Sequence, residues 1–158
     1  MERQPGGDTS PASTAAEPAG HLPGWDALPA YRDPADPGTA GVLARLQGAG
    51  LTPKDVLTAL RDAGDALHEQ ATSDEAEWAQ QVGGPLTVAL LAAEVGALAA
   101  HLGTRAAAVR SRAVRELLDE YSAVAVAEAL GVSRQKVYDI AREVDRPPFI
   151  RTSPWRQP

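Results

Sequence analysis

The sequence predicts an all-helical protein that begins with a disordered tail and ends in a compact unit of three helices. Three observations support this prediction. From residue 41 onward, apolar residues recur every three or four positions, which is the spacing of one helix face. Glycine and helix-capping residues mark the ends of short helices near the C-terminus. The first 40 residues contain seven of the 13 prolines and cannot sustain a helical or strand period.

These features predict four segments: a disordered tail at 1–40, a helical region at 41–104, a three-helix domain at 105–145 and an Arg- and Pro-rich tail at 146–158. A length of 158 residues allows one domain of ordinary size with flexible ends. The absence of cysteine excludes a disulfide framework and a thiolate zinc site. No charged start precedes an apolar run, so we expect a cytoplasmic protein. Thirteen arginines against two lysines indicate GC-rich coding DNA, and hence a bacterial source.

The tail contains one apolar segment, HLPGWDALPAY, with Leu22, Trp25, Leu28 and Tyr31. Two interpretations remain open for it. It is either a short motif that docks on a protein partner, or a segment that lies loosely on its own domain.

The helical region begins with a short helix at 41–47 and a connector at 48–50. Thr52 is then a typical N-cap, with Pro53 at the first helical position. The apolar residues that follow predict one stripe, and so a helical hairpin: Val56, Leu57, Leu60, Gly64 and Leu67. The polar stretch 70–81 predicts a frayed link, which Gly83, Gly84 and Pro85 bring to an end.

Residues 86–102 are the most apolar stretch, with Thr87, Glu94 and His101 as its polar members. We expect this helix to be buried on every face, in a core or in the seam of a homodimer. A membrane span is disfavoured, because the run has 17 residues where about 20 are needed, and because it carries a carboxylate. The histidines at 21, 68 and 101 lack the spacing of metal ligands, so we expect no metal site.

The C-terminal domain is predicted from three apolar patterns. Val124, Ala127 and Leu130 lie on one face of a short helix that Gly131 ends in a left-handed conformation. Val132 points inward and Ser133 caps the next helix, whose predicted core residues are Val137, Ile140 and Val144. A helix from about Arg105 to Glu120 precedes them, with two adjacent stripes: Val109, Ala113 and Leu117, and Val114, Leu118 and Tyr121.

Residues 122–143 resemble the bacterial helix-turn-helix, in the homeodomain-like form found at the C-termini of serine resolvases and invertases and in small repressors. The matching residues are Ala127, Leu130, Gly131, Val132, Ser133, Arg134, Val137, Tyr138 and Ile140. The resemblance covers about 40 residues and departs at Ala125, where a Glu that closes a capping box with Ser122 is common. It implies a tri-helical fold and sequence-specific binding to double-stranded DNA, most simply in transcriptional regulation.

The DNA-binding residues that we predict lie in and beside the second helix of this motif: Ser133, Arg134, Gln135, Lys136, Tyr138 and Arg142. Gln135 and Arg142 suit adenine and guanine edges, whereas Lys136 and the Tyr138 hydroxyl suit phosphates. Asp139 repels phosphates; it either reads a cytosine amino group or restrains Arg142. In the C-terminal tail, Arg146, Arg151 and Arg156 form either a minor-groove arm or a loose end.

The distribution of charge along the sequence is compatible with DNA binding by the C-terminal part of the chain. Residues 105–158 carry ten basic and seven acidic side chains, whereas residues 1–104 carry five basic and 14 acidic side chains.

No phosphate-binding loop, dinucleotide fingerprint or paired histidine is present, so we expect no enzyme activity and no cofactor. Besides a dimeric regulator, two alternatives remain: an accessory protein that organises phage or plasmid DNA, and an adaptor whose N-terminal region binds a protein partner.

Overall fold

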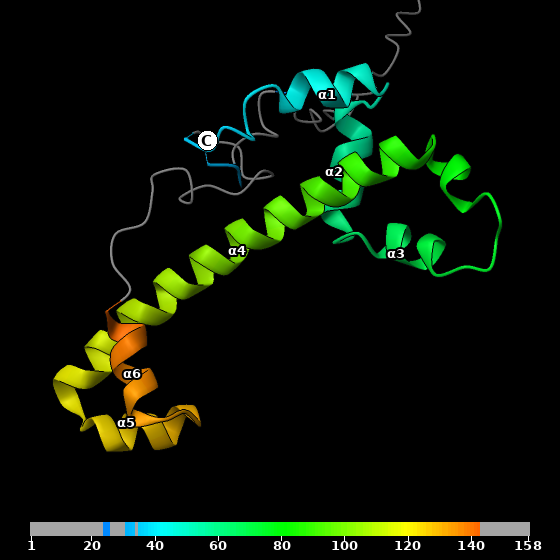
Figure 1. Cartoon of the computed structure of the whole chain (residues 1–158). Helices are drawn as coiled ribbons and strands as arrows, with labels where there is room; N and C mark the ends of the chain where they lie inside the picture. Colours follow the sequence, from blue (N-terminus) through cyan, green and yellow to red (C-terminus); the bar gives the residue numbers. More distant parts are fainter. Residues whose placement is uncertain (1–23, 26–30, 34, 143–158) are drawn as a thin grey trace, which may run out of the picture.

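The computed structural model describes residues 24–25, 31–33 and 35–142. These residues form helices and no strand, which confirms the all-helical class. The elements are α1 (Val42–Gly48), α2 (Pro53–Arg61), α3 (Asp65–Ala71), the 3-10 helix η2 (Trp78–Val82), α4 (Pro85–Glu120), α5 (Ala123–Leu130) and α6 (Arg134–Ala141). In Figure 1, α4 spans the molecule, with α1, α2 and α3 beside its N-terminal half and α5 and α6 at its other end.

Helix α4 is one continuous element of 36 residues, so the prediction of separate helices at 86–102 and 105–120 was wrong. Gly103 does not end the helix, because an internal glycine costs a helix only about 1 kcal/mol relative to alanine. Thr104 also fits within the helix, because its hydroxyl donates a hydrogen bond to the Ala100 carbonyl at 2.9 Å. The expected domain boundary between residues 104 and 105 therefore lies inside a helix.

The two halves of α4 bury nearly opposite faces. The N-terminal half buries Leu91, Glu94 and Leu98, and the C-terminal half buries Val114. At about 100° per residue, Val114 lies roughly 200° around the helix from Glu94. Within a single chain, residues 86–102 are thus buried on one face, and their burial in a homodimer seam stays a prediction. In its most apolar window, which has a mean hydropathy of 1.7 and suffices by length and composition to cross a membrane, 33% of the residues are buried.

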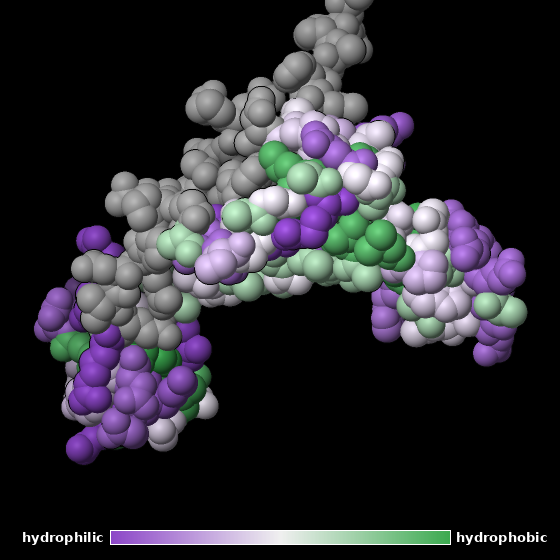
Figure 2. Space-filling model, turned by 45° about the horizontal axis from the view of Figure 1, so that its top comes forward, coloured by the Kyte–Doolittle hydropathy of each residue, from purple (hydrophilic) through white to green (hydrophobic). Residues whose placement is uncertain are grey.

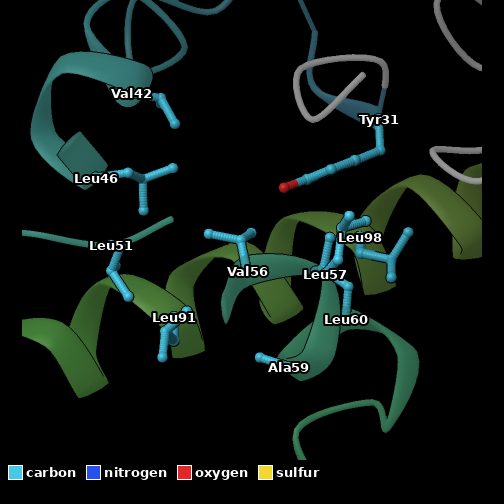
Figure 3. Packing of buried hydrophobic residues seen from close by; sticks show 10 residues of the cluster. All are labelled: Tyr31, Val42, Leu46, Leu51, Val56, Leu57, Ala59, Leu60, Leu91 and Leu98. Carbon is cyan, nitrogen blue, oxygen red and sulfur yellow. The ribbon is translucent and has the colours of Figure 1, made fainter. Parts of the chain in front are cut away.

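The first core lies between α1, α2 and the N-terminal half of α4 (Figure 3). Its buried members are Tyr31, Val42, Leu46, Leu51, Val56, Leu57, Ala59, Leu60, Leu91 and Leu98. The predicted cap of α2 is confirmed: the Thr52 hydroxyl accepts a hydrogen bond from the Asp55 amide, and the Asp55 carboxylate accepts one from the Thr52 amide. This capping box fixes where α2 begins and so aims its apolar face at α4.

The predicted single stripe from Val56 to Leu67 is interrupted, because the chain reverses between α2 and α3. Ala63 and Gly64 both adopt positive φ, at 56° and 84°. The Asp62 carboxylate accepts a hydrogen bond from the Gly64 amide at 2.9 Å, which stabilises the turn. Between α3 and α4 the polar link is mostly irregular, as expected, but η2 forms at its end, and Pro85 occupies the first turn of α4.

Tyr31 anchors the N-terminal segment to α4, so the prediction of disorder over 1–40 was wrong for 31–33 and 35–40. Tyr31 is 1% exposed, and its hydroxyl donates to a Glu94 Oε2 at 2.6 Å. Arg32 binds the same carboxylate through both oxygens, at 3.0 and 2.5 Å. Trp25 packs against the same core, which favours a segment lying on its own domain. Leu22 and Leu28 lie outside the described residues.

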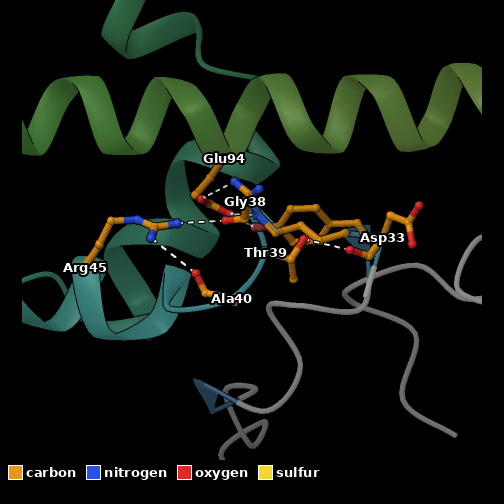
Figure 4. Close-up of polar contacts among 8 residues, drawn as sticks. Asp33, Gly38, Thr39, Ala40, Arg45 and Glu94 are labelled. Atoms are coloured by element: carbon orange, nitrogen blue, oxygen red, sulfur yellow. Dashed lines mark hydrogen bonds and ion pairs between the residues drawn. The ribbon is translucent and has the colours of Figure 1, made fainter. Parts of the chain in front are cut away.

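A series of turns leads from this anchor to α1 (Figure 4). The Thr39 hydroxyl donates to the Asp33 carbonyl at 2.8 Å, and the Arg45 guanidinium donates to the Gly38 and Ala40 carbonyls at 2.8 and 3.2 Å. These bonds satisfy carbonyl groups that no helix or strand pairs. They hold Asp33 and residues 35–40 against α1 and so keep Arg32 beside Glu94.

A second core lies between the C-terminal end of α4, α5 and α6. It contains Val114, Val126, Ala127, Val137 and Ile140, with Leu117, Leu118, Val132 and Ala141 packed against it. The predicted core residues of α6 are confirmed, and Val144 lies outside the described residues. On α5 the prediction is confirmed for Ala127, which is buried, and wrong for Val124 and Leu130, which are 61% and 37% exposed; Val126 is buried in their place. Of the stripes predicted on α4, Val109, Ala113 and Tyr121 are exposed.

Tyr31→Phe tests the anchor. Removing the hydroxyl leaves a buried carboxylate with one donor fewer, and we expect the free energy of unfolding to fall by about 1.5–3 kcal/mol. Tyr121→Phe is the matched control, because Tyr121 is 56% exposed. Urea titration measures both variants, and an unchanged stability in Tyr31→Phe would contradict the assigned role.

The same residue predicts a pH dependence. Burial, and then the hydrogen bond to Glu94, raise the pKa of Tyr31 far above its ordinary value. The folded chain therefore holds this proton more tightly than the unfolded chain, and the corresponding stability is present below about pH 10 and is lost above it. We expect the wild-type protein to lose stability above about pH 10 with an extra slope near 1.4 kcal/mol per pH unit. Tyr31→Phe should lack this slope.

Candidate nucleic-acid interface

The turn between α5 and α6 has the geometry that the sequence predicted. Gly131 adopts φ 65° and ψ 33°, the left-handed conformation that favours glycine. Its amide donates to the Glu128 carbonyl at 3.2 Å, and the Val132 amide donates to the Ala127 carbonyl at 3.0 Å. These two bonds form a Schellman motif, which ends α5 and directs Val132 toward the core.

Serine caps begin both helices. The Ser122 hydroxyl accepts a hydrogen bond from the Ala125 amide at 3.3 Å, and the Ser133 hydroxyl accepts one from the Lys136 amide at 3.1 Å. Ala125, where the resemblance would have a glutamate, does not prevent the first cap. Because Val137 and Ile140 are buried, the caps and the core together fix which side of α6 faces outward.

The outward side of α6 presents all six predicted contact residues to solvent: Ser133, Arg134, Gln135, Lys136, Tyr138 and Arg142. Gln135 lies about 200° from the buried Val137, and Arg142 about 200° from Ile140. Lys136 lies about 100° from Val137, to one flank. Figure 2 shows hydrophilic side chains gathered over this end of the molecule.

Asp139 connects the two side chains that point outward. Its Oδ1 accepts a hydrogen bond from the Gln135 Nε2 at 3.1 Å and lies 3.8 Å from the Arg142 Nη1. This geometry supports the interpretation that Asp139 restrains Arg142. The contact with Gln135 was not predicted, although the spacing of four residues on a helix was a sufficient signal for it.

The charge of this end is only weakly positive. Residues 105–142 contain seven basic and five acidic side chains. One arginine is engaged locally, because the Arg112 Nε donates to a Glu116 Oε1 at 3.0 Å on an exposed face. Such exposed pairs contribute little to stability but reduce the charge available to a polyanion. Arg146, Arg151 and Arg156 lie outside the described residues.

Within the described residues, no group of three or more His, Asp or Glu side chains is arranged to hold a metal ion. Comparison with protein-family models, with curated proteins and with solved structures found no match to the chain. The geometry of α4, α5 and α6 is therefore the basis on which we infer a function.

Gly131→Ala tests the turn. A Cβ at this position meets no atom within 4 Å, so its cost is the left-handed backbone alone. We expect a loss of about 1–2 kcal/mol in the free energy of unfolding, measured by thermal or urea denaturation. Gly131→Asn should lose less, because asparagine tolerates this conformation better. Equal losses in both variants would contradict the explanation.

Proposed function

We propose that the chain is a sequence-specific DNA-binding protein of the helix-turn-helix class, and that it regulates transcription. The observation that carries the proposal is the outward side of α6, where Gln135, Lys136 and Arg142 are exposed on a helix whose other side is buried. In this class the second helix of the motif enters the major groove, which admits an α-helix. The resemblance of residues 122–143 supports the same role for α6.

The roles that we propose follow from the position of each residue on α6. Gln135 and Arg142 would read base edges. Lys136 and Tyr138 flank them and would contact the phosphate backbone, together with the N-terminus of α6 at Ser133 and Arg134. Asp139 would keep the Gln135 and Arg142 side chains from contacting the phosphate backbone. No catalytic residue and no cofactor enter this proposal, and its setting would be the bacterial cytoplasm.

We also propose that the chain acts as a homodimer, because one such motif buries little DNA surface. The outer face of α4, on the side of the helix opposite the buried Glu94, favours a second copy as the partner, and Leu86 at the edge of this face is 66% exposed. Small exposed residues follow this face at intervals of three and four, namely Ala89, Ala92, Gly96, Ala99, Gly103 and Ala106. A Cβ at Gly96 or Gly103 would meet no atom within 4 Å, so a second helix has room to approach.

DNA binding is tested with the full chain and three alanine variants. We expect affinity for duplex DNA to fall as salt rises, because each neutralised phosphate releases counterions. Gln135→Ala and Arg142→Ala should each cost about 1–3 kcal/mol and relax the preference at one base position. Lys136→Ala should weaken binding to all sequences alike and reduce the salt slope by about one. Selection from a randomised site library distinguishes these outcomes.

The same measurements separate the alternatives. Equal losses in all three variants on every sequence would favour a protein that organises DNA without reading it. Undetectable binding to duplex DNA at low salt would favour the adaptor, whose N-terminal region binds a protein.

Ala99→Glu tests the dimer. Burying an unpaired carboxylate between two copies of α4 should weaken association at least about tenfold. Ala44→Glu is the matched control, because Ala44 is exposed on α1, away from the proposed seam. Analytical ultracentrifugation measures both variants beside the wild type. A wild-type protein that sediments as a monomer at micromolar concentration would contradict the proposal.

A further inference from the structure

A recess lies between α2, α3, η2 and α4, at the opposite end of the molecule from α6. Its volume is ≈ 210 Å³. The apolar part of its lining consists of Ala59, Ala66, Leu67, Val82 and Leu91, and the polar part of Asp55, Thr58, Asp62 and Gln70. No arginine or lysine lines it, so its only formal charges are the two carboxylates.

Among these polar groups the Thr58 hydroxyl is already engaged as a donor, and acceptors outnumber the donors that remain. The Thr58 hydroxyl donates to the Lys54 carbonyl at 2.9 Å. The carboxylates of Asp55 and Asp62 accept hydrogen bonds from the amides of Thr52 and Gly64, at the starts of α2 and α3. The hydrogen bonds from Thr52 lower the pKa of Asp55, which favours its charged form. A ligand that fits must therefore bring donors or a positive charge.

Gln70 gives the strongest indication of what is missing. Its Oε1 is buried and has no hydrogen-bond partner. An unsatisfied buried acceptor costs roughly 1–3 kcal/mol, a cost that a donor from a ligand would remove once the Gln70 side chain turned its Oε1 toward the recess. Because Gln70 lines the recess on the α3 side and Asp55 and Asp62 lie on the α2 side, a ligand between them would meet acceptors from two helices.

Helix α3 covers the recess without packing tightly. It has no buried residue, and Leu67 is only partly buried against the first core. Ala63, with φ 56°, connects it to α2 in a conformation that costs a non-glycine residue about 1–2 kcal/mol. A neighbouring recess of ≈ 270 Å³ lies on the other side of Leu67, between α3 and α4. Both faces of α3 thus leave space that a small shift would enlarge.

We propose that this recess binds a small organic cation, with a short apolar body against Leu67, Val82 and Leu91 and an ammonium group directed at Gln70 and the carboxylates. A carboxylate or phosphate ligand is disfavoured by repulsion from Asp55 and Asp62. The site does not depend on α6, so DNA binding and ligand binding succeed or fail independently.

The experiment uses the full chain and three probes of equal length: n-hexylammonium, hexan-1-ol and hexanoate. NMR of the Leu and Val methyl groups locates and titrates each probe. We expect n-hexylammonium to shift the signals of Leu67, Val82 and Leu91 and to bind at least about tenfold more tightly than the alcohol, the equivalent of one charged hydrogen bond. Hexanoate should bind most weakly.

Two variants and a control identify the contacts. Gln70→Leu should weaken n-hexylammonium at least about fivefold while leaving hexan-1-ol unchanged or tighter. Leu67→Trp should fill the recess and abolish binding of both, with helix content checked by circular dichroism. Gln47→Leu, on the exposed side of α1, is the matched control and should have no effect. Equal affinities for the three probes, no response to Gln70→Leu, or shifts spread over the whole surface would overturn the proposal.

Discussion

The continuity of α4 is the constraint on which the rest of the structure depends. This one helix contributes Leu91 and Leu98 to the first core and Val114 to the second. Each residue turns the helix by a fixed angle, so the number of residues between Leu98 and Val114 decides on which side of α4 each core lies. That number therefore fixes the orientation of α6 relative to α1 and α2. Adding one residue between them would turn α6 by about 100° around the axis of α4.

Such an arrangement leaves apolar surface uncovered, because a long helix that packs on one side at each end has a free side in between. Tyr31 and Arg32 complete the first core, because they cover the Glu94 carboxylate and donate hydrogen bonds to it. A buried carboxylate is tolerated only when it is paired and hydrogen-bonded, and here both oxygens have donors. The exposed face of α4 has no comparable cover within the described residues, and the proposed second copy would supply it.

Local signals predicted well the features that local energetics determine. Thr52, Pro53, Gly131 and Ser133 mark helix ends because the conformations and hydrogen bonds there involve neighbours in sequence. The outward side of α6 followed from the same reasoning, since an eight-residue helix with Val137 and Ile140 buried leaves little choice.

Features that depend on contacts distant in sequence were not predictable in this way. Tyr31 lies in a Pro-rich segment whose composition indicates disorder, yet it is held by Glu94, 63 residues away. On α5, Val124 and Val126 are equally apolar, and only the approach of α4 and α6 decides that Val126 is buried. Glycine is typical of helix ends, but at Gly103 the packing at both ends of α4 outweighs the small cost of a glycine inside a helix.

The weak charge around α6 determines how DNA binding would have to work. With seven basic and five acidic side chains, residues 105–142 would neutralise few phosphates, so non-specific attraction alone would give low affinity. Selectivity then depends on base contacts whose side chains are already oriented, and Asp139 orients both Gln135 and Arg142 in the free protein. Its negative charge would also repel the DNA backbone at every site, so that only sites with matching bases for those two side chains would offset this repulsion. A second copy on the same DNA would multiply this discrimination. The proposed roles of the exposed face of α4 in dimerisation and of the outward side of α6 in DNA binding therefore depend on each other.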